Sequence, residues 1–154
     1  MKIYVASSWR NEFQNIVVTL LRGLGHEVYD FKKPHGGIGF SWSSVDPQWQ
    51  DWTSQEYVKS LEHPEAEKGF QKDFDAMKWA DACVMVLPCG RSANTEAGWM
   101  KGAGKLVYVL QLNRQEPELM YKLYDAIFTD VHELSYIPMI SPVNAQPSPY
   151  DNFK

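Results

Sequence analysis

Residues 82–99 read ACVMVLPCGRSANTEAGW, an apolar run followed by a short polar loop and then by a sequence that favours a helix. The run has the length and composition of a buried strand. Ligands of α/β proteins bind beyond the carboxyl ends of such strands, so the loop is expected to line a pocket. Glu96 falls in the first turn of a helix predicted from about Thr95 to Ala103, where negative charge is stabilised and the carboxyl should be ionised at neutral pH. A carboxylate that only stabilises the helix fits the same placement.

Strand and helix patterns alternate around this segment. The chain opens on a β-branched and aromatic run at residues 2–6, continues with an apolar repeat of three and four over 13–24, and reaches a second strand at 26–31. A βαβ start with short connections predicts a parallel sheet with helices on both faces. The later predicted elements are a helix from Pro64 to about Trp79, a strand at 106–110 and a helix at 118–127. We therefore expect a single α/β domain, residues 1–136, with a flavodoxin- or Rossmann-like sheet of about five parallel strands.

Two segments break this pattern. Residues 32–53 interleave glycine and proline with phenylalanine and tryptophan, and a loop of this length in a compact domain is usually functional or disordered. We expect either a lid or subunit contact, or a loop that packs its own tryptophans against the body. Residues 137–154 form a proline-rich tail that is predicted to be extended.

Composition narrows the function. The 154 residues have a formal net charge of −4. Proteins that bind nucleic acid polymers usually carry a basic surface, so this class of protein is not predicted. No apolar run reaches the roughly 20 residues that span a bilayer, and the first residues do not resemble a signal peptide, so a cytoplasmic protein is expected. Cys83 and Cys89 flank one predicted strand and should be reduced thiols. The histidines are scattered without ligand spacing, so no metal site and no other cofactor is predicted.

An acidic residue occupies the apolar stripe of the predicted 64–79 helix. Asp73 lies three residues after Phe70 and four before Met77, on the side expected to face the core, whereas Asp75 should face solvent. A carboxylate that faces a core is costly unless it is paired, hydrogen-bonded or protonated. Asp73 is therefore either a structural acid that accepts backbone donors, or an acid with a raised pKa that lines a pocket and donates protons.

The turn after the first strand should share a crevice with the loop of residues 90–94. Side chains and helix amino termini there would donate to a sugar hydroxyl or a phosphate. The chain lacks a Walker loop and a G-x-G-x-x-G motif, so binding of ATP or an intact dinucleotide is not predicted. Two carboxylates in one polar crevice are the usual means of breaking a glycosidic bond with retention. The candidate binding residues are Ser7, Ser8, Arg10, Gly90, Arg91, Ser92 and Asn94.

Three segments together resemble the nucleoside 2-deoxyribosyltransferase family, which includes the 2′-deoxynucleoside 5′-monophosphate N-glycosidases. They are the opening strand at 2–6, the 73–81 segment that leads into a buried strand, and the 96–107 segment that begins Glu-Ala-Gly. The resemblance covers about residues 1–110. It implies that Glu96 is a nucleophile that forms a covalent bond with the anomeric carbon of deoxyribose. It also implies that Asp73 assists departure of the base by proton transfer and that Tyr4 holds the nucleophilic carboxylate in line. From the residue pattern alone, Tyr4 would be a core aromatic.

The loop before Glu96 departs from the family pattern. Some transferases have a second acid there, whereas residues 90–94 contain Arg91 and no acid. This difference favours a deoxynucleoside 5′-monophosphate over a free nucleoside, and it leaves transfer and hydrolysis both open. The resemblance further implies a homo-oligomer whose subunits complete one another's sites, in agreement with the apolar loop and tail.

Two other functions also fit the sequence. One is a nucleotide-binding protein without catalysis, in which Glu96 binds sugar hydroxyls. The other is an NAD-type glycohydrolase of the Toll/interleukin-receptor-like kind, which also uses a glutamate on a flavodoxin-like sheet.

Overall fold

The computed structural model describes residues 1–34 and 37–138 of the chain. Within this part, one sheet is formed by five parallel strands in the order β2-β1-β3-β4-β5. This confirms the predicted α/β fold and the number of strands. The strands are β1 (Lys2–Ala6), β2 (Glu27–Asp30), β3 (Ala82–Val86), β4 (Leu106–Leu110) and β5 (Ala126–Phe128).

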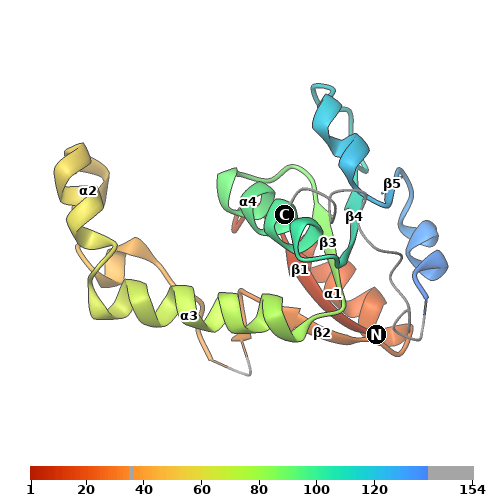
Figure 1. Ribbon diagram of the computed structural model, residues 1–154, viewed down its shortest axis with the longest axis horizontal. Helices are drawn as coiled ribbons and strands as arrows, with labels where there is room; N and C mark the ends of the chain where they lie inside the picture. Colours follow the sequence, from red (N-terminus) through yellow and green to blue (C-terminus); the bar gives the residue numbers. More distant parts are fainter. Residues whose placement is uncertain (35–36, 139–154) are drawn as a thin grey trace, which may run out of the picture.

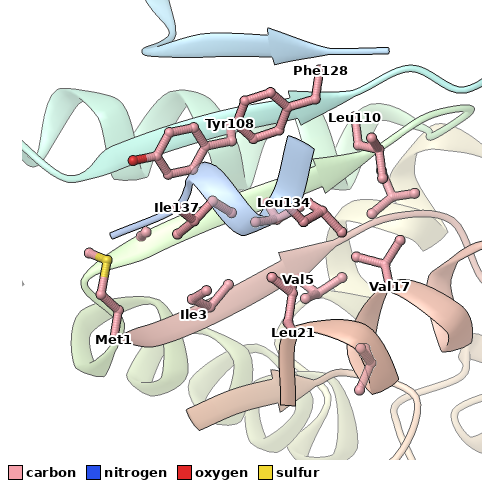
Figure 2. Close-up of a cluster of buried hydrophobic side chains, with 14 residues drawn as sticks. Met1, Ile3, Val5, Val17, Leu21, Tyr108, Leu110, Phe128, Leu134 and Ile137 are labelled. Atoms are coloured by element: carbon pink, nitrogen blue, oxygen red, sulfur yellow. The ribbon is translucent and has the colours of Figure 1, made fainter. Parts of the chain in front are cut away.

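Helices cover both faces of the sheet (Figure 1). Alternate residues of a strand point to opposite faces, so Ile3 and Val5 of β1 lie under one layer, and Tyr4 lies under the other. Figure 2 shows the first layer, where Val17 of α1 (Gln14–Gly23) and Leu134 of η5 (Val131–Tyr136) pack over the sheet. The second layer consists of α3 (Pro64–Trp79) and α4 (Arg91–Gly102), and this layer faces the Tyr4 side.

Helix α3 has the bounds that the sequence predicts. Pro64 occupies the first turn, where its missing N–H costs nothing, and the His63 side chain accepts a hydrogen bond from the Glu65 N–H. The predicted apolar stripe is only partly correct. Met77 is buried, but Phe70 is 57% exposed and stacks on Phe74, with ring centroids 5.4 Å apart.

The predicted helix at 118–127 is wrong. The segment forms a 3-10 helix, η4 (Leu119–Leu123), and then β5. Strand β5 forms the edge of the sheet and pairs with β4, with Phe128 opposite Leu110. The Phe128 ring stacks on Tyr108, with ring centroids 5.5 Å apart. A short apolar run fits both the 3.6-residue period of a helix and the two-residue period of a strand. Here the pairing with the open edge of β4 overrides the helical pattern.

The aromatic segment after residue 36 folds into short helices. These are η2 (Trp42–Ser44), η3 (Trp49–Asp51) and α2 (Ser54–Ser60). Trp42 makes edge contacts with Phe40 and Trp52, at centroid distances of 4.9 and 5.5 Å. Phe40 also packs against Gly69 of α3. Trp42 and Trp52 thus pack on each other, and the segment lies beside the first half of α3, which extends away from the sheet (Figure 1).

Three further expectations concern the chain as a whole. Cys83 is buried and Cys89 is half-buried, and both are free thiols. None of the helices in residues 1–34 and 37–138 has the length and apolar character needed to cross a membrane. The tail predicted to be extended begins at Ile137, and its residues from 139 onward lie outside the described part of the chain.

Candidate active site

The structure brings Glu96, Asp73 and Tyr4 together on the face of the sheet that α3 and α4 cover. They come from α4, α3 and β1, and the charges of both carboxyls act on the Tyr4 hydroxyl. The two acids that the sequence singled out therefore face one site, although 23 residues separate them in the chain.

Glu96 differs from the sequence prediction in position and in charge. Helix α4 begins at Arg91 and not near Thr95, so Glu96 lies in its second turn, beyond the amino-terminal amides. The pKa of Glu96 is raised to about 7, mainly by burial and to a lesser extent by the Asp73 charge, and the Tyr4 hydroxyl opposes both effects. The prediction of a fully ionised Glu96 at neutral pH is wrong, because desolvation outweighs the helix dipole at this position.

Asp73 has a raised pKa, as one of the two alternatives for this residue predicted. Burial is the main cause, and it outweighs two opposing effects, a hydrogen bond from Tyr29 and the charge of Lys72. The Tyr29 hydroxyl donates to Asp73 Oδ1 at 2.7 Å. Asp75 is exposed and pairs with Lys78 at 2.6 Å, as a solvent-facing acid should.

Tyr4 is fully buried, and its ring stacks on Tyr29 with centroids 5.4 Å apart and planes 15° apart. The Tyr4 hydroxyl acts on Glu96 closely enough to lower the pKa of that carboxyl, yet it makes no hydrogen bond of normal geometry with any described residue. Burial and the Glu96 charge raise the pKa of Tyr4 far above its ordinary value. A buried, protonated hydroxyl without a partner is uncommon in a core, and a catalytic role is one of the explanations for such a group.

Two site residues escaped the sequence reading because only strand register reveals them. Tyr29 of β2 and Cys83 of β3 both lie opposite Tyr4 in the parallel ladder, so the three side chains form a row across the sheet. Burial and then the Glu96 charge raise the pKa of the Cys83 thiol. The thiol therefore stays protonated and adds no charge beside Glu96.

The loop before α4 is tied to η4 through Asn94. Its Nδ2 donates to the Gly90 carbonyl at 3.0 Å and to Cys89 Sγ at 3.5 Å, and its Oδ1 accepts from the Tyr121 hydroxyl at 3.1 Å. Tyr121 in turn stacks on Tyr124, with centroids 5.7 Å apart. Asn94 thus braces the loop, and the sequence reading missed both tyrosines because the segment was expected to be a helix.

Ser7 binds the end of a neighbouring strand. Its Oγ donates to the Val86 carbonyl at 2.9 Å, and Asn11 Nδ2 donates to the Val86 and Pro88 carbonyls at 3.0 Å each. The turn after β1 and the loop after β3 therefore meet at the carboxyl ends of these two neighbouring strands, as predicted. Asn11 was missed because a lone asparagine in a loop has no distinguishing pattern.

The remaining candidate binding residues lie on the surface around this edge. Ser8 Oγ accepts a hydrogen bond from the Arg10 N–H at 3.2 Å, and Arg10 itself is exposed. Gly90 is the N-cap of α4 and supplies no side-chain cap, so the first amides of the helix have no side-chain acceptor at that position. Arg91 and Ser92 are exposed in the first turn of the same helix.

A comparison with solved structures identifies the fold. The chain is similar to a 2-deoxyribosyltransferase from Bacillus psychrosaccharolyticus, with a TM-score of 0.59 and 22% sequence identity over 90% of this chain and 93% of that chain. The chain has the fold of a 2-deoxyribosyltransferase. The CMP N-glycosidase BcmB from Clostridium botulinum is also similar, with a TM-score of 0.49 and 16% identity over 88% of this chain and 96% of that chain. Neither a protein-family model nor a curated protein sequence matches this chain.

Proposed function

We propose that this protein cleaves the N-glycosidic bond of 2′-deoxynucleosides or 2′-deoxynucleoside 5′-monophosphates, with Glu96 as the nucleophile. The main support is the convergence of two carboxyls with raised pKa values, Glu96 and Asp73, beside the unpartnered hydroxyl of Tyr4. Acids whose pKa values are shifted by burial and by a neighbouring charge are characteristic of sites of acid–base chemistry. A shared fold with a 2-deoxyribosyltransferase agrees with this assignment.

The chemistry requires one ionised and one protonated carboxyl. The Glu96 carboxylate attacks the anomeric carbon and forms a glycosyl ester, while the Asp73 carboxylic acid gives its proton to the departing base. In the proposed reaction the Tyr4 hydroxyl, which makes no hydrogen bond of normal geometry with the described residues of the free protein, donates to the Glu96 carboxylate and keeps one of its oxygens in line with the sugar. Water or a second base then attacks the same carbon and releases Glu96.

The two carboxyls titrate as a coupled pair. Burial raises the pKa of both, that of Glu96 to about 7, and the Asp73 charge contributes to the rise at Glu96. We take the singly protonated pair as the active form, because the proton can occupy either site. Positive charge that develops on the sugar stabilises ionised Glu96, and a base that covers Asp73 favours its neutral form. A bell-shaped dependence of kcat/KM on pH follows, with its upper limb near pH 7.

A 5′-phosphate would lie at the start of α4. The helix amino terminus has no side-chain cap, and Arg91 stands in its first turn, so amide donors and a guanidinium are both available to an anion. This placement supports a monophosphate substrate. We also propose that the protein is cytoplasmic and, because Phe70 and Trp99 leave an aromatic surface exposed between α3 and α4, that it is a homo-oligomer.

The decisive experiment is incubation with a panel of deoxynucleosides and deoxynucleoside monophosphates, with and without a free acceptor base, followed by chromatography of the bases. Release of base without acceptor identifies a hydrolase, and exchange only with acceptor identifies a transferase. Glu96→Ala should lose all cleavage and remain folded. Binding without turnover would replace the proposal with a non-catalytic nucleotide-binding function, and cleavage of NAD alone would replace it with a glycohydrolase.

A further inference from the structure

Tyr29 connects the edge strand of the sheet to the acid on α3. Its side chain is buried, and its hydroxyl donates to Asp73 Oδ1 at 2.7 Å, which is short enough for a strong bond to a charged acceptor. This is a contact between a strand and a helix that are 44 residues apart in the sequence. One carboxyl oxygen is fixed by the bond, and Oδ2 is left free of it.

The Tyr29 ring is itself held by Tyr4. The two residues are directly opposite in the β1–β2 ladder, and their rings are nearly parallel at 5.4 Å. Tyr29 is also among the residues that line a cavity of about 670 Å³, together with other β2 residues and Trp79. The stack on Tyr4 and the bond to Asp73 therefore orient Tyr29. Of the two stacked tyrosines, Tyr29 donates to Asp73, and the Tyr4 hydroxyl lies close enough to Glu96 to lower the pKa of that carboxyl.

The charges around this contact keep Tyr29 a donor. Burial, the bond to Asp73 and the charges of Asp73, Glu96 and Asp30 all raise the pKa of Tyr29, so its hydroxyl stays protonated at any pH at which the protein is assayed. The groups that face Asp73 are Tyr29 from β2, Lys72 from its own helix, and Glu96 and Tyr4 from α4 and β1. A permanent donor favours the ionised form of Asp73 and opposes the effect of burial.

We propose that Tyr29 is a positioning residue for Asp73, which it holds through Oδ1 in the orientation from which the carboxyl meets the departing base. This inference rests on the proposed function, in which Asp73 donates a proton to that base. Its geometric part, the donation from Tyr29 to Asp73, can be tested without any turnover. Tyr29 does not contact the sugar and acts only through the acid.

The first test is a titration of Asp73 by NMR in protein labelled with ¹³C at aspartate carboxyls, with Asp73→Asn to assign its signal. Tyr29→Phe keeps the stack on Tyr4 and removes only the hydroxyl. It should raise the titration midpoint of Asp73 by about one pH unit, since the ionised form loses a donor. The matched control is Tyr108→Phe, which removes a hydroxyl from a buried tyrosine on the opposite face of the sheet (Figure 2). An unmoved midpoint in Tyr29→Phe, or an equal shift in the control, would overturn the proposal.

The second test is a double-mutant cycle on activity. Tyr29→Phe should lower kcat about tenfold, leave KM within a factor of about two, and move the acid limb of the pH profile upward by about one pH unit. In an Asp73→Asn background the same substitution should have almost no further effect. A full additional loss in that background would show that Tyr29 does not act through Asp73. Failure of the proposed function looks different, because wild-type protein would then release no base while the NMR shift persisted.

Discussion

Replacement of Glu96 by glutamine should stabilise the protein at pH 8 and do little at pH 4. The carboxyl has a pKa of about 7 in the fold and 4.5 as its ordinary value, so folding takes up a proton between these limits. Stability from this group is therefore unimpaired below pH 4.5, falls as pH rises from 4.5 to 7, and stays low above pH 7. The ionised side chain costs about 3 kcal/mol at pH 8 and about 1 kcal/mol at pH 5.

Glutamine has nearly the same shape and cannot ionise, so it removes this cost and changes little else. The measurement is urea unfolding of wild type and Glu96→Gln from pH 5 to pH 8.5, reported as the difference in unfolding free energy at each pH. The difference should grow by about 2 kcal/mol across the range, equivalent to a rise in Tm of several degrees for a domain of this size.

The matched control is Glu12→Gln, which removes a carboxylate from the exposed turn before α1. Its difference from wild type should stay small and flat with pH. A Glu96→Gln difference that is equally flat would refute the reasoning, because it would mean that Glu96 is solvated in the fold and has no raised pKa. Loss of cleavage by this variant is expected in either case and tests the role of nucleophile separately.

Three further expectations concern Asp73, Arg91 and two helical glycines. Asp73→Asn should reduce turnover strongly while stability is equal or higher, since asparagine removes a poorly solvated charge; a loss of several kcal/mol in unfolding measurements would instead mark Asp73 as structural. Arg91→Ala should lower kcat/KM for a deoxynucleoside monophosphate by roughly one to two orders of magnitude and leave the matching nucleoside unaffected; equal losses on both would remove the phosphate role. Gly98→Ala should raise the free energy of unfolding by about 0.5–1 kcal/mol, because nothing lies near the added methyl group. Gly69→Ala should lower it, because the methyl group would lie 2.8 Å from Phe40. Equal gains of the two variants in thermal unfolding would contradict the packing of Phe40 on α3.

The sequence predicts the elements that have strong boundaries. The apolar runs of β1, β3 and β4 and the Pro64 start of α3 all appear where the pattern puts them. The start of α4 was misplaced because its true N-cap is Gly90, which gives no side-chain signal. Asn94 and Thr95 look like caps, but both lie inside the helix, where their side chains donate to the Gly90 and Arg91 carbonyls.

The residues of the candidate site also differ in whether the sequence predicts them. Asp73 could be found from sequence because an acid breaks the apolar period of its helix. Tyr29 could not, because its importance depends on the pairing of β2 with β1 and on the approach of α3. Tyr121 was hidden for a related reason, since the helix expected at 118–127 would have placed its side chain differently.

The row of side chains under the two acids explains why the acids alone should control the chemistry near neutral pH. Tyr29, Tyr4 and Cys83 cross β2, β1 and β3 side by side, and burial holds the pKa of each well above its ordinary value. All three side chains therefore remain neutral over the pH range in which Asp73 and Glu96, which lie over this row, titrate. Substituting one of the tyrosines by phenylalanine changes the pKa of a carboxyl without adding or removing a charge. Limbs of the activity profile that move with Tyr4 or Tyr29 would thus report on the carboxyl that each hydroxyl faces.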